Sequence, residues 1–360
     1  MILARYILAE FFQPLTFGVV IFSFVLLLDK LFDLADLIFN RGIPALSVLK
    51  LFVIFLPTIL PLTIPMAILL ATLVSYGRLA QDGEITAVRA SGISLWKITW
   101  PILLLAGASS ILLIPFNREV SPRAHAYFRR MFSRMISADP LLQLEPRQFF
   151  EMRDLKLYTE EVDPSHQRLG RTILYRMRAD LPADRIFSQS GTYERAPDHF
   201  RLNLKNGQFE RYDLQDAAKL LHARFQTYSI EVSLGSMQPD SSIDIHDLTS
   251  PQLSATLQEK GEQGPMAHEL VSELQLRHAV ALAPLALGLL GIPIGMVLDR
   301  GGRAMGFGVS VAVLFVYYLL LVLGLSLSER GVSPAGLSIW VANLVCLGIG
   351  SGLYARMLKK

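Results

Sequence analysis

The chain has 360 residues, of which 52% are hydrophobic and only 18% are charged, and its net charge is +3. Soluble proteins carry about 25% charged residues, so this deficit and the mean hydropathy of +0.40 indicate a membrane protein. The small net charge, with no basic run interleaved with aromatic residues, argues against a nucleic-acid partner. The single cysteine, Cys346, excludes an intrachain disulfide.

The N-terminal apolar stretch has the charge order of a signal peptide, since Arg5 precedes it. Its apolar part, residues 11–28, is longer than the roughly 7–15 residues of a signal-peptide core. Asp29 and Lys30 follow it, where a cleavage site would need small residues. We therefore expect a retained membrane span.

Six segments are apolar and long enough to cross a bilayer, which takes about 20 helical residues. They cover residues 11–30, 51–75, 98–116, 279–298, 305–327 and 335–356. In the second segment Pro57, Pro61 and Pro65 lie near one helical face, and each removes a backbone hydrogen bond. These prolines favour a bent packing helix over the alternative, a moving hinge.

The basic residues of the short loops set the expected orientation of the spans. With the N-terminus in the cytoplasm, nine basic residues flank the inner ends and four flank the outer ends. The inner residues are Arg5, Arg78, Arg89, Lys97, Arg300, Arg303, Arg356, Lys359 and Lys360, and the outer ones are Lys30, Arg41, Lys50 and Arg330. This bias predicts a multi-pass protein with both termini in the cytoplasm.

A polar insert separates the third span from the fourth, and in this topology it is external, in the periplasm of a bacterium. It begins with a helical piece at 121–137. Strands are then predicted at 148–151, 155–161, 171–177, 185–193, 200–204, 208–212 and 225–232. Asn206-Gly207 predicts a hairpin turn between two of these strands.

The expected fold is therefore a membrane α-helical protein with an inserted antiparallel β domain that has one apolar interior. Residues 1–116 hold the first three spans, 117–276 form the periplasmic β domain with flanking helices, and 277–360 hold the last three spans.

The sequence lacks the motifs of the common catalytic sites. It has no Walker A phosphate loop, no H-E-x-x-H, no G-x-S-x-G and no C-x-x-C, and its histidines are scattered without ligand spacing. We expect no enzyme activity, no metal and no cofactor. The spans are also nearly free of ionisable groups, which excludes an intramembrane proton relay. If the chain moves a cargo, the energy must come from another subunit, and an uncharged cavity suits a cargo with acyl chains.

The loop between the second and third spans, residues 77–94, predicts a short helix over 83–91. Asp82 is a favourable N-cap residue, and Glu84 in the first turn complements the helix dipole, as Arg89 does in the last turn.

The sequence of the same loop also predicts where this helix ends and which of its faces is apolar. Gly92 occupies the position where a glycine ends a helix, and Ile85 and Val88 form a small apolar face. Because so short a helix is only marginally stable on its own, its apolar face must pack on the membrane surface, on the protein's own spans or on a partner.

Several motifs together resemble the lipopolysaccharide export permease family, LptF/LptG. They are M-I-x-x-R-Y at 1–6, L-D-K-L at 28–31, G-E-I-T at 83–86, R-A-S-G-I-S at 89–94, E-L-Q-L-R at 273–277, P-I-G at 293–295 and R-G-G-R at 300–303. The resemblance covers the whole chain, including the position and size of the insert, and it is somewhat closer to the F-type permease.

This resemblance implies the permease subunit of an ABC-type exporter. Such a subunit pairs with a sister permease and binds a cytoplasmic ATPase dimer. The complex takes lipopolysaccharide from the inner membrane and passes it to a single-span periplasmic bridge protein. The external domain of the family is a β-jellyroll, which joins the jellyroll of the bridge protein edge to edge.

The resemblance also implies roles for individual residues. Glu84 matches the acidic residue of the coupling helix, about 82–92, that docks in the ATPase, and Asp82, Ile85 and Arg89 belong to the same helix. Lys30 matches a basic residue that contacts lipopolysaccharide phosphates, although an interfacial lysine can also be a snorkelling anchor. The first and fifth spans line the lateral gate of the family, and Phe24, Leu27 and Phe315 are the lipid-binding candidates there.

Two other function classes compete with the exporter. A membrane-anchored periplasmic scaffold without transport would explain the spans and the β domain but has no need of the cytoplasmic helix. A permease of the lipoprotein-releasing type is disfavoured, because its large external domain follows the first of four spans.

Two glycine pairs, Gly291/Gly295 and Gly348/Gly352, have the spacing of close helix contacts.

Overall fold

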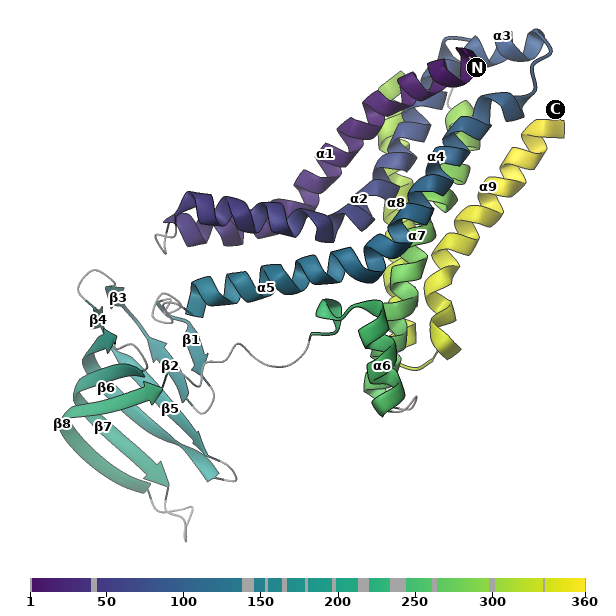
Figure 1. Ribbon diagram of the computed structural model, residues 1–360. Helices are drawn as coiled ribbons and strands as arrows, with labels where there is room; N and C mark the ends of the chain where they lie inside the picture. Colours follow the sequence, from purple (N-terminus) through teal and green to yellow (C-terminus); the bar gives the residue numbers. More distant parts are fainter. Residues whose placement is uncertain are drawn as a thin grey trace. The chain divides into compact units, whose positions relative to one another are not determined.

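The computed structural model describes residues 2–39, 44–137, 146–152, 155–163, 167–178, 181–195, 199–212, 220–233, 244–260, 264–297, 302–332 and 334–359. Arg41, Arg300 and Lys360, which entered the orientation argument, lie outside these residues. The contacts of the chain divide it into a helical unit, Met1–Arg129 with Ile243–Lys360, and a β unit, Arg130–Ser242 (Figure 1).

The helical unit contains the expected membrane spans. Its long helices are α1 (Ile2–Phe39), α2 (Ala45–Gln81), α4 (Leu95–Pro115), α7 (Pro265–Val297), α8 (Gly302–Glu329) and α9 (Val341–Lys359). Its shorter elements are α3 (Glu84–Ala90), the π-helix η1 (Phe116–Val120), α5 (Ser121–Ser137), which continues past the unit boundary, η4 (Ile245–Asp247), α6 (Ser250–Lys260) and η5 (Pro334–Trp340). Six helical segments of the described residues are long and apolar enough to cross a membrane, which confirms the predicted spans. The helices run past the predicted limits because hydropathy marks only their apolar parts.

Close packing between α7 and α2 involves one of the two glycine pairs. A Cβ on Gly291 would lie 3.1 Å from Thr72 Cβ, and one on Gly295 would lie 2.9 Å from Tyr76 Cβ, so this pair is confirmed as a close helix contact. The prediction for Gly348/Gly352 is wrong, since no described neighbouring atom lies within 4 Å of either Cβ position. Gly350, between them, makes the close approach of α9 to α7 instead.

The three prolines of the second span lie inside the continuous helix α2, which bends along its length (Figure 1). Pro61 and Pro65 are buried against neighbouring helices. Tyr318 of α8 donates a hydrogen bond to the carbonyl oxygen of Leu62 between them, at 3.1 Å. This burial and external hydrogen bonding favour the bent packing helix.

The β unit contains an antiparallel sheet of eight strands. They are β1 (Phe149–Met152), β2 (Leu155–Thr159), β3 (Val162–Asp163), β4 (Arg168–Leu169), β5 (Thr172–Arg178), β6 (Leu181–Arg195), β7 (His199–Tyr212) and β8 (Leu220–Ser233). The long strand β6 pairs with β5 along one half, with β4 near its other end, and with β7 along most of its length. Leu202 and Leu204 of β7 are buried in the apolar core of this unit, as their alternation predicts.

The predicted hairpin turn at Asn206-Gly207 is wrong, because β7 runs through both residues and keeps one register with β6 and β8. Asn206 takes a left-handed φ of +52° within the strand. A Cβ on Gly207 would lie 2.2 Å from the carbonyl oxygen of Phe187 and 2.3 Å from the ring of Phe225. The glycine therefore serves a close approach between strands, not a turn.

The α2–α7 contact generates a stability prediction. Gly295→Ala should destabilise the helical unit by about 1–3 kcal/mol, because the new methyl group meets Tyr76 and the backbone of Leu73. Gly348→Ala is the matched control, since it adds the same methyl group to open space. Thermal unfolding in detergent should show a lower midpoint for the first variant and no loss for the second. Equal midpoints would contradict the close packing.

Candidate functional site

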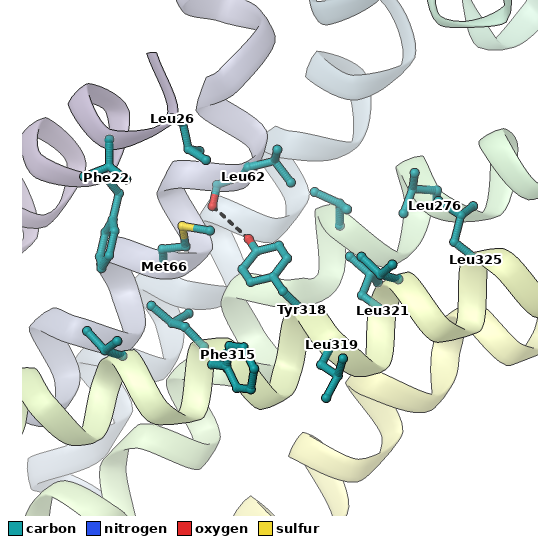
Figure 2. Close-up of a pocket in the computed structure, with 15 residues that line it drawn as sticks. Phe22, Leu26, Leu62, Met66, Leu276, Phe315, Tyr318, Leu319, Leu321 and Leu325 are labelled. Atoms are coloured by element: carbon teal, nitrogen blue, oxygen red, sulfur yellow. Dashed lines mark hydrogen bonds between the residues drawn. The ribbon is translucent and has the colours of Figure 1, made fainter. Parts of the chain in front are cut away.

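An open apolar groove of about 720 Å³ lies among α1, α2, α7 and α8 (Figure 2). Its walls are formed by Phe22, Val25, Leu26, Leu62, Met66, Leu276, Val280, Val311, Leu314, Phe315, Tyr318, Leu319, Leu321, Val322 and Leu325. Tyr318 carries the one polar side-chain group of this lining, and its hydroxyl is directed to the carbonyl of Leu62. A wall without free polar groups disfavours charged ligands and favours hydrocarbon chains.

The structure places one of the four lipid-binding candidates in the wall of this groove and a second, Lys30, beyond that wall. Phe315 lines it and is 69% exposed. Lys30 follows Phe22 and Leu26 at intervals of four residues, so it lies near the same face of α1, just beyond the groove lining. Its Nζ lies 2.9 Å from Asp33 Oδ2, and both side chains are partly exposed.

The other two candidates do not line the groove. Leu27 is buried, at 3% exposure, and Phe24 is 55% exposed outside the lining. Their neighbours Val25 and Leu26 occupy the wall instead. A helix turns about 100° per residue, and one sequence does not reveal which face of an almost wholly apolar helix turns inward.

A second, smaller cavity of about 290 Å³ also lies among α1, α2 and α8. It is lined by Glu10, Gln13, Pro14, Phe17, Leu70, Val74 and Phe307. Glu10 and Gln13 give it a polar side that the first groove lacks. Glu10 also pairs with Arg78, with 3.1 Å between Oε2 and Nη1.

The loop between α2 and α4 forms the predicted helix, α3, but its start differs from the prediction. Asp82 does not cap α3, because it ends α2, and its backbone N–H donates to the carbonyl of Arg78 at 2.9 Å. Gly83, with a left-handed φ of +71°, precedes the first helical residue. Arg78, four residues before Asp82, also attracts the Asp82 carboxylate, with 3.6 Å between Nε and Oδ2.

The predicted end of α3 is confirmed. Gly92 has a left-handed φ of +79°. Its N–H donates to the carbonyl of Arg89 at 3.0 Å, and the N–H of Ile93 donates to Val88 at 3.3 Å. These two hydrogen bonds satisfy the last carbonyls of the helix, which is what a glycine at this position permits.

A polar network ties α3 to α1 and α2. The Tyr6 hydroxyl donates to Glu84 Oε1 at 2.9 Å and accepts a hydrogen bond from Arg78 Nη2 at 2.7 Å. Arg78 also reaches Glu84 directly, at 3.4 Å. Together with the pair between Arg78 and Glu10, these contacts join three helices at one guanidinium group.

The apolar face of α3 packs on the protein's own spans. Ile85 is buried in a cluster with Ile7 of α1 and Leu79 of α2, and Val88 packs against it. The exposed side of the helix carries Thr86, Ala87 and Arg89. Of the predicted coupling residues, Glu84 and Ile85 thus face inward, whereas Asp82 and Arg89 are exposed.

Sequence reasoning missed the partners of these residues. Tyr6 belongs to the opening motif and Arg78 is four residues from Asp82, but nothing local brings either to Glu84. The groove residues of α2 and α7, such as Met66 and Leu276, likewise depend on helix packing.

Comparison with curated proteins finds no match to the chain. Comparison with protein families gives a match over residues 5–356 to the family described as "Lipopolysaccharide export system permease LptF/LptG". The match spans the six apolar helices and the β unit, and it does not separate the F type from the G type. The family and the six helices indicate a multi-pass protein of the inner membrane. The chain belongs to the lipopolysaccharide export permease family LptF/LptG.

Proposed function

We propose that this permease is the F-type subunit of an exporter that draws lipopolysaccharide out of the inner membrane and passes it to a periplasmic bridge protein. A separate ATPase dimer supplies the energy, and a sister permease completes the membrane complex. The observation that carries the proposal is the apolar groove among α1, α2, α7 and α8, with Lys30 beyond one end of its α1 wall.

The groove and Lys30 suit the two parts of this lipid. Each methylene group of an acyl chain that leaves water for an apolar wall gains about 0.8 kcal/mol, and a lipid already in the membrane finds an equivalent environment. The Lys30 ammonium group can hold a phosphorylated headgroup near the interface while the chains lie in the groove.

The orientation we propose places both termini in the cytoplasm and the β domain, 117–276 with its flanking helices, in the periplasm. Figure 1 draws the N-terminus, α3 and the C-terminus at one end of the helical unit. Contacts at that end include the hydrogen bond of Tyr6 with Glu84 and that of Thr99 with Tyr354, at 2.6 Å. The basic bias of the short loops supports the cytoplasm as the side of that end.

A membrane-anchored scaffold remains the alternative, and the groove argues against it. A scaffold needs neither an open apolar groove nor a helix tied by Arg78 to two spans.

Site-specific photo-crosslinking tests the lipid assignment. A photoreactive residue at Phe315, in the groove, should crosslink to lipopolysaccharide in cells, whereas one at Leu344, exposed on α9 outside the groove, should not. Lys30→Ala should lower the yield at Phe315 several-fold, and the matched Lys50→Ala should leave it unchanged. Equal crosslinking from Phe315 and Leu344 would contradict the groove as the lipid site, and an unchanged yield in Lys30→Ala would leave Lys30 as an anchor.

The proposed ATPase contact uses the exposed side of α3, because Ile85 and Glu84 are engaged within the chain. Ala87→Trp should abolish co-purification of the ATPase, since the indole occupies the docking surface. Ala355→Trp, on an exposed face near the end of α9, is the matched control and should retain it. Glu84→Gln and Tyr6→Phe should retain binding but lower the lipid released per ATP hydrolysed, because α3 loses its hold on α1. Full co-purification with Ala87→Trp would rule out this docking surface.

The bridge protein, we propose, adds to the free edge of β8. Among the described strands β8 pairs with β7 alone, and its 14 residues offer a much longer edge than the 4 residues of β1. A photoreactive residue at the exposed Gln226 of β8 should trap the bridge protein, and one at the exposed Phe149 of β1 should not. Trapping from Phe149 alone would assign the contact to the opposite edge.

A further inference from the structure

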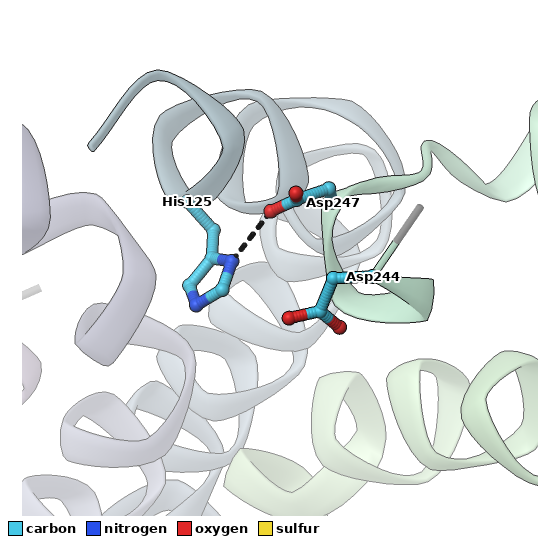
Figure 3. Close-up of side chains that lie close together, drawn as sticks. All are labelled: His125, Asp244 and Asp247. Carbon is cyan, nitrogen blue, oxygen red and sulfur yellow. Dashed lines mark hydrogen bonds and ion pairs between the residues drawn. The ribbon is translucent and has the colours of Figure 1, made fainter. Parts of the chain in front are cut away.

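The helical unit holds the two connections to the β unit next to each other. The chain leaves this unit along α5 and returns just before η4. Arg129 of α5 forms an ion pair with Asp247 and lies 3.6 Å from Asp244, measured between Nη1 and Oδ2. His125 Nδ1 lies 2.8 Å from Asp247 Oδ1, and Figure 3 shows the imidazole ring turned toward that carboxylate. Because Arg129 of the outgoing helix contacts both carboxylates of the returning segment, this cluster is an ion-pair clamp between the outgoing and the returning chain.

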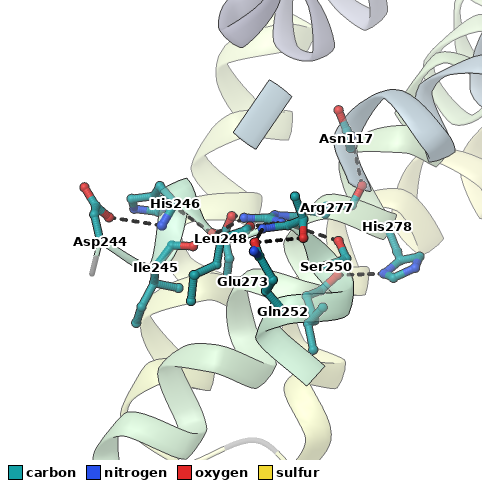
Figure 4. A network of polar contacts seen from close by, with 12 residues as sticks. Asn117, Asp244, Ile245, His246, Leu248, Ser250, Gln252, Glu273, Arg277 and His278 are labelled. Atoms are coloured by element: carbon teal, nitrogen blue, oxygen red, sulfur yellow. Dashed lines mark hydrogen bonds and ion pairs between the residues drawn. The ribbon is translucent and has the colours of Figure 1, made fainter. Parts of the chain in front are cut away.

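A buried arginine fixes the returning chain to α7. Arg277 is only 7% exposed, and its guanidinium group donates to the carbonyls of Leu248 at 2.7 Å and Ile245 at 3.4 Å (Figure 4). It also reaches Ser250 Oγ at 3.4 Å and pairs with Glu273 at 2.8 Å. One side chain of α7 thus holds the segment that runs from η4 into α6.

Two further contacts complete this network. Asn117 of η1 donates from Nδ2 to the backbone carbonyl of Arg277 at 3.0 Å. His246 Nδ1 lies 3.2 Å from the second oxygen of Glu273, and this hydrogen bond raises the pKa of His246 above its ordinary value. The π-helix that follows α4, the returning segment and α7 are therefore joined at Arg277.

The same stretch of α7 forms part of the groove wall. Leu276, adjacent to Arg277, and Val280, one turn later, both line the groove. A buried guanidinium group is costly to desolvate, and its removal takes one hydrogen-bond donor from each of two carbonyls and from the Glu273 carboxylate. The turn of α7 that borders the groove thus also holds, through Arg277, the segments that lead to and from the β unit.

We propose that Arg277 is a positioning residue that links the groove wall on α7 to both connections of the β unit, and that passage of lipid from the groove to the β unit depends on this link. The inference rests on the proposed function. A change in the width of the groove moves α7, and the clamp carries that movement to the outgoing and returning chain together. Arg277 does not touch the lipid in this role.

The test uses the complete complex with its ATPase and sister permease, and it separates the two stages of transfer. Photoreactive residues at Leu319 in the groove and at Tyr228 on β8 report lipopolysaccharide at each stage. Arg277→Met should keep the Leu319 yield and ATP hydrolysis, and should lower the Tyr228 yield at least fivefold. Arg123→Met is the matched control, because Arg123 is exposed and its ion pair is with Glu119, four residues earlier in the chain.

A second variant covers the case in which Arg277→Met fails to fold. Arg129→Gln breaks the clamp at a partly exposed position and should lower the Tyr228 yield in the same direction. An unchanged Tyr228 yield in either folded variant overturns the proposal, and so does an equal loss at Leu319 and Tyr228. If the wild-type complex itself gives no crosslink at Leu319, the proposed function fails, whatever Arg277 does.

Discussion

The close approach of α7 to α2 is the constraint on which the rest of the helical unit depends. Gly291 and Gly295 let the two backbones approach until side chains of one helix touch the glycine positions of the other. Both α1 and α8 pack against α2, and α9 packs against α7 through Gly350. The space left among α1, α2, α7 and α8 is the groove, so the site is a consequence of how tightly its two central helices meet.

Polar interactions are concentrated at the two ends of this apolar unit. At one end, Arg78 gathers Glu10, Tyr6 and Glu84 and so joins α3 to α1, one wall of the groove. At the other end, Arg277 joins α7, another wall of the groove, to the connections of the β unit. An apolar groove cannot itself exchange signals with an ATPase or a β domain. The charged groups at its ends, where Arg277 is buried and Arg78 is partly exposed, offer directional contacts for that purpose, at the cost of desolvation.

The sequence predicts whatever depends on local pattern. Hydropathy finds the six spans, and Gly92 ends α3 because a left-handed position there favours glycine. Asp82 fails as a cap of α3 because it ends α2, and Gly207 fails as a turn because β7 continues through it and its missing side chain permits a close approach to Phe187 and Phe225. For Arg277 the sequence offers only the i,i+4 pair with Glu273, since the carbonyls of Ile245 and Leu248 are brought near it by folding.

We propose that this permease moves lipopolysaccharide with energy from another subunit. The most direct measurement is lipid release from proteoliposomes that contain the chain, the sister permease and the ATPase, with a soluble bridge domain outside as acceptor. We expect release that requires ATP and all three subunits, and no ATP hydrolysis by the purified chain alone. Release without ATP, or hydrolysis by the chain alone, would contradict the proposal.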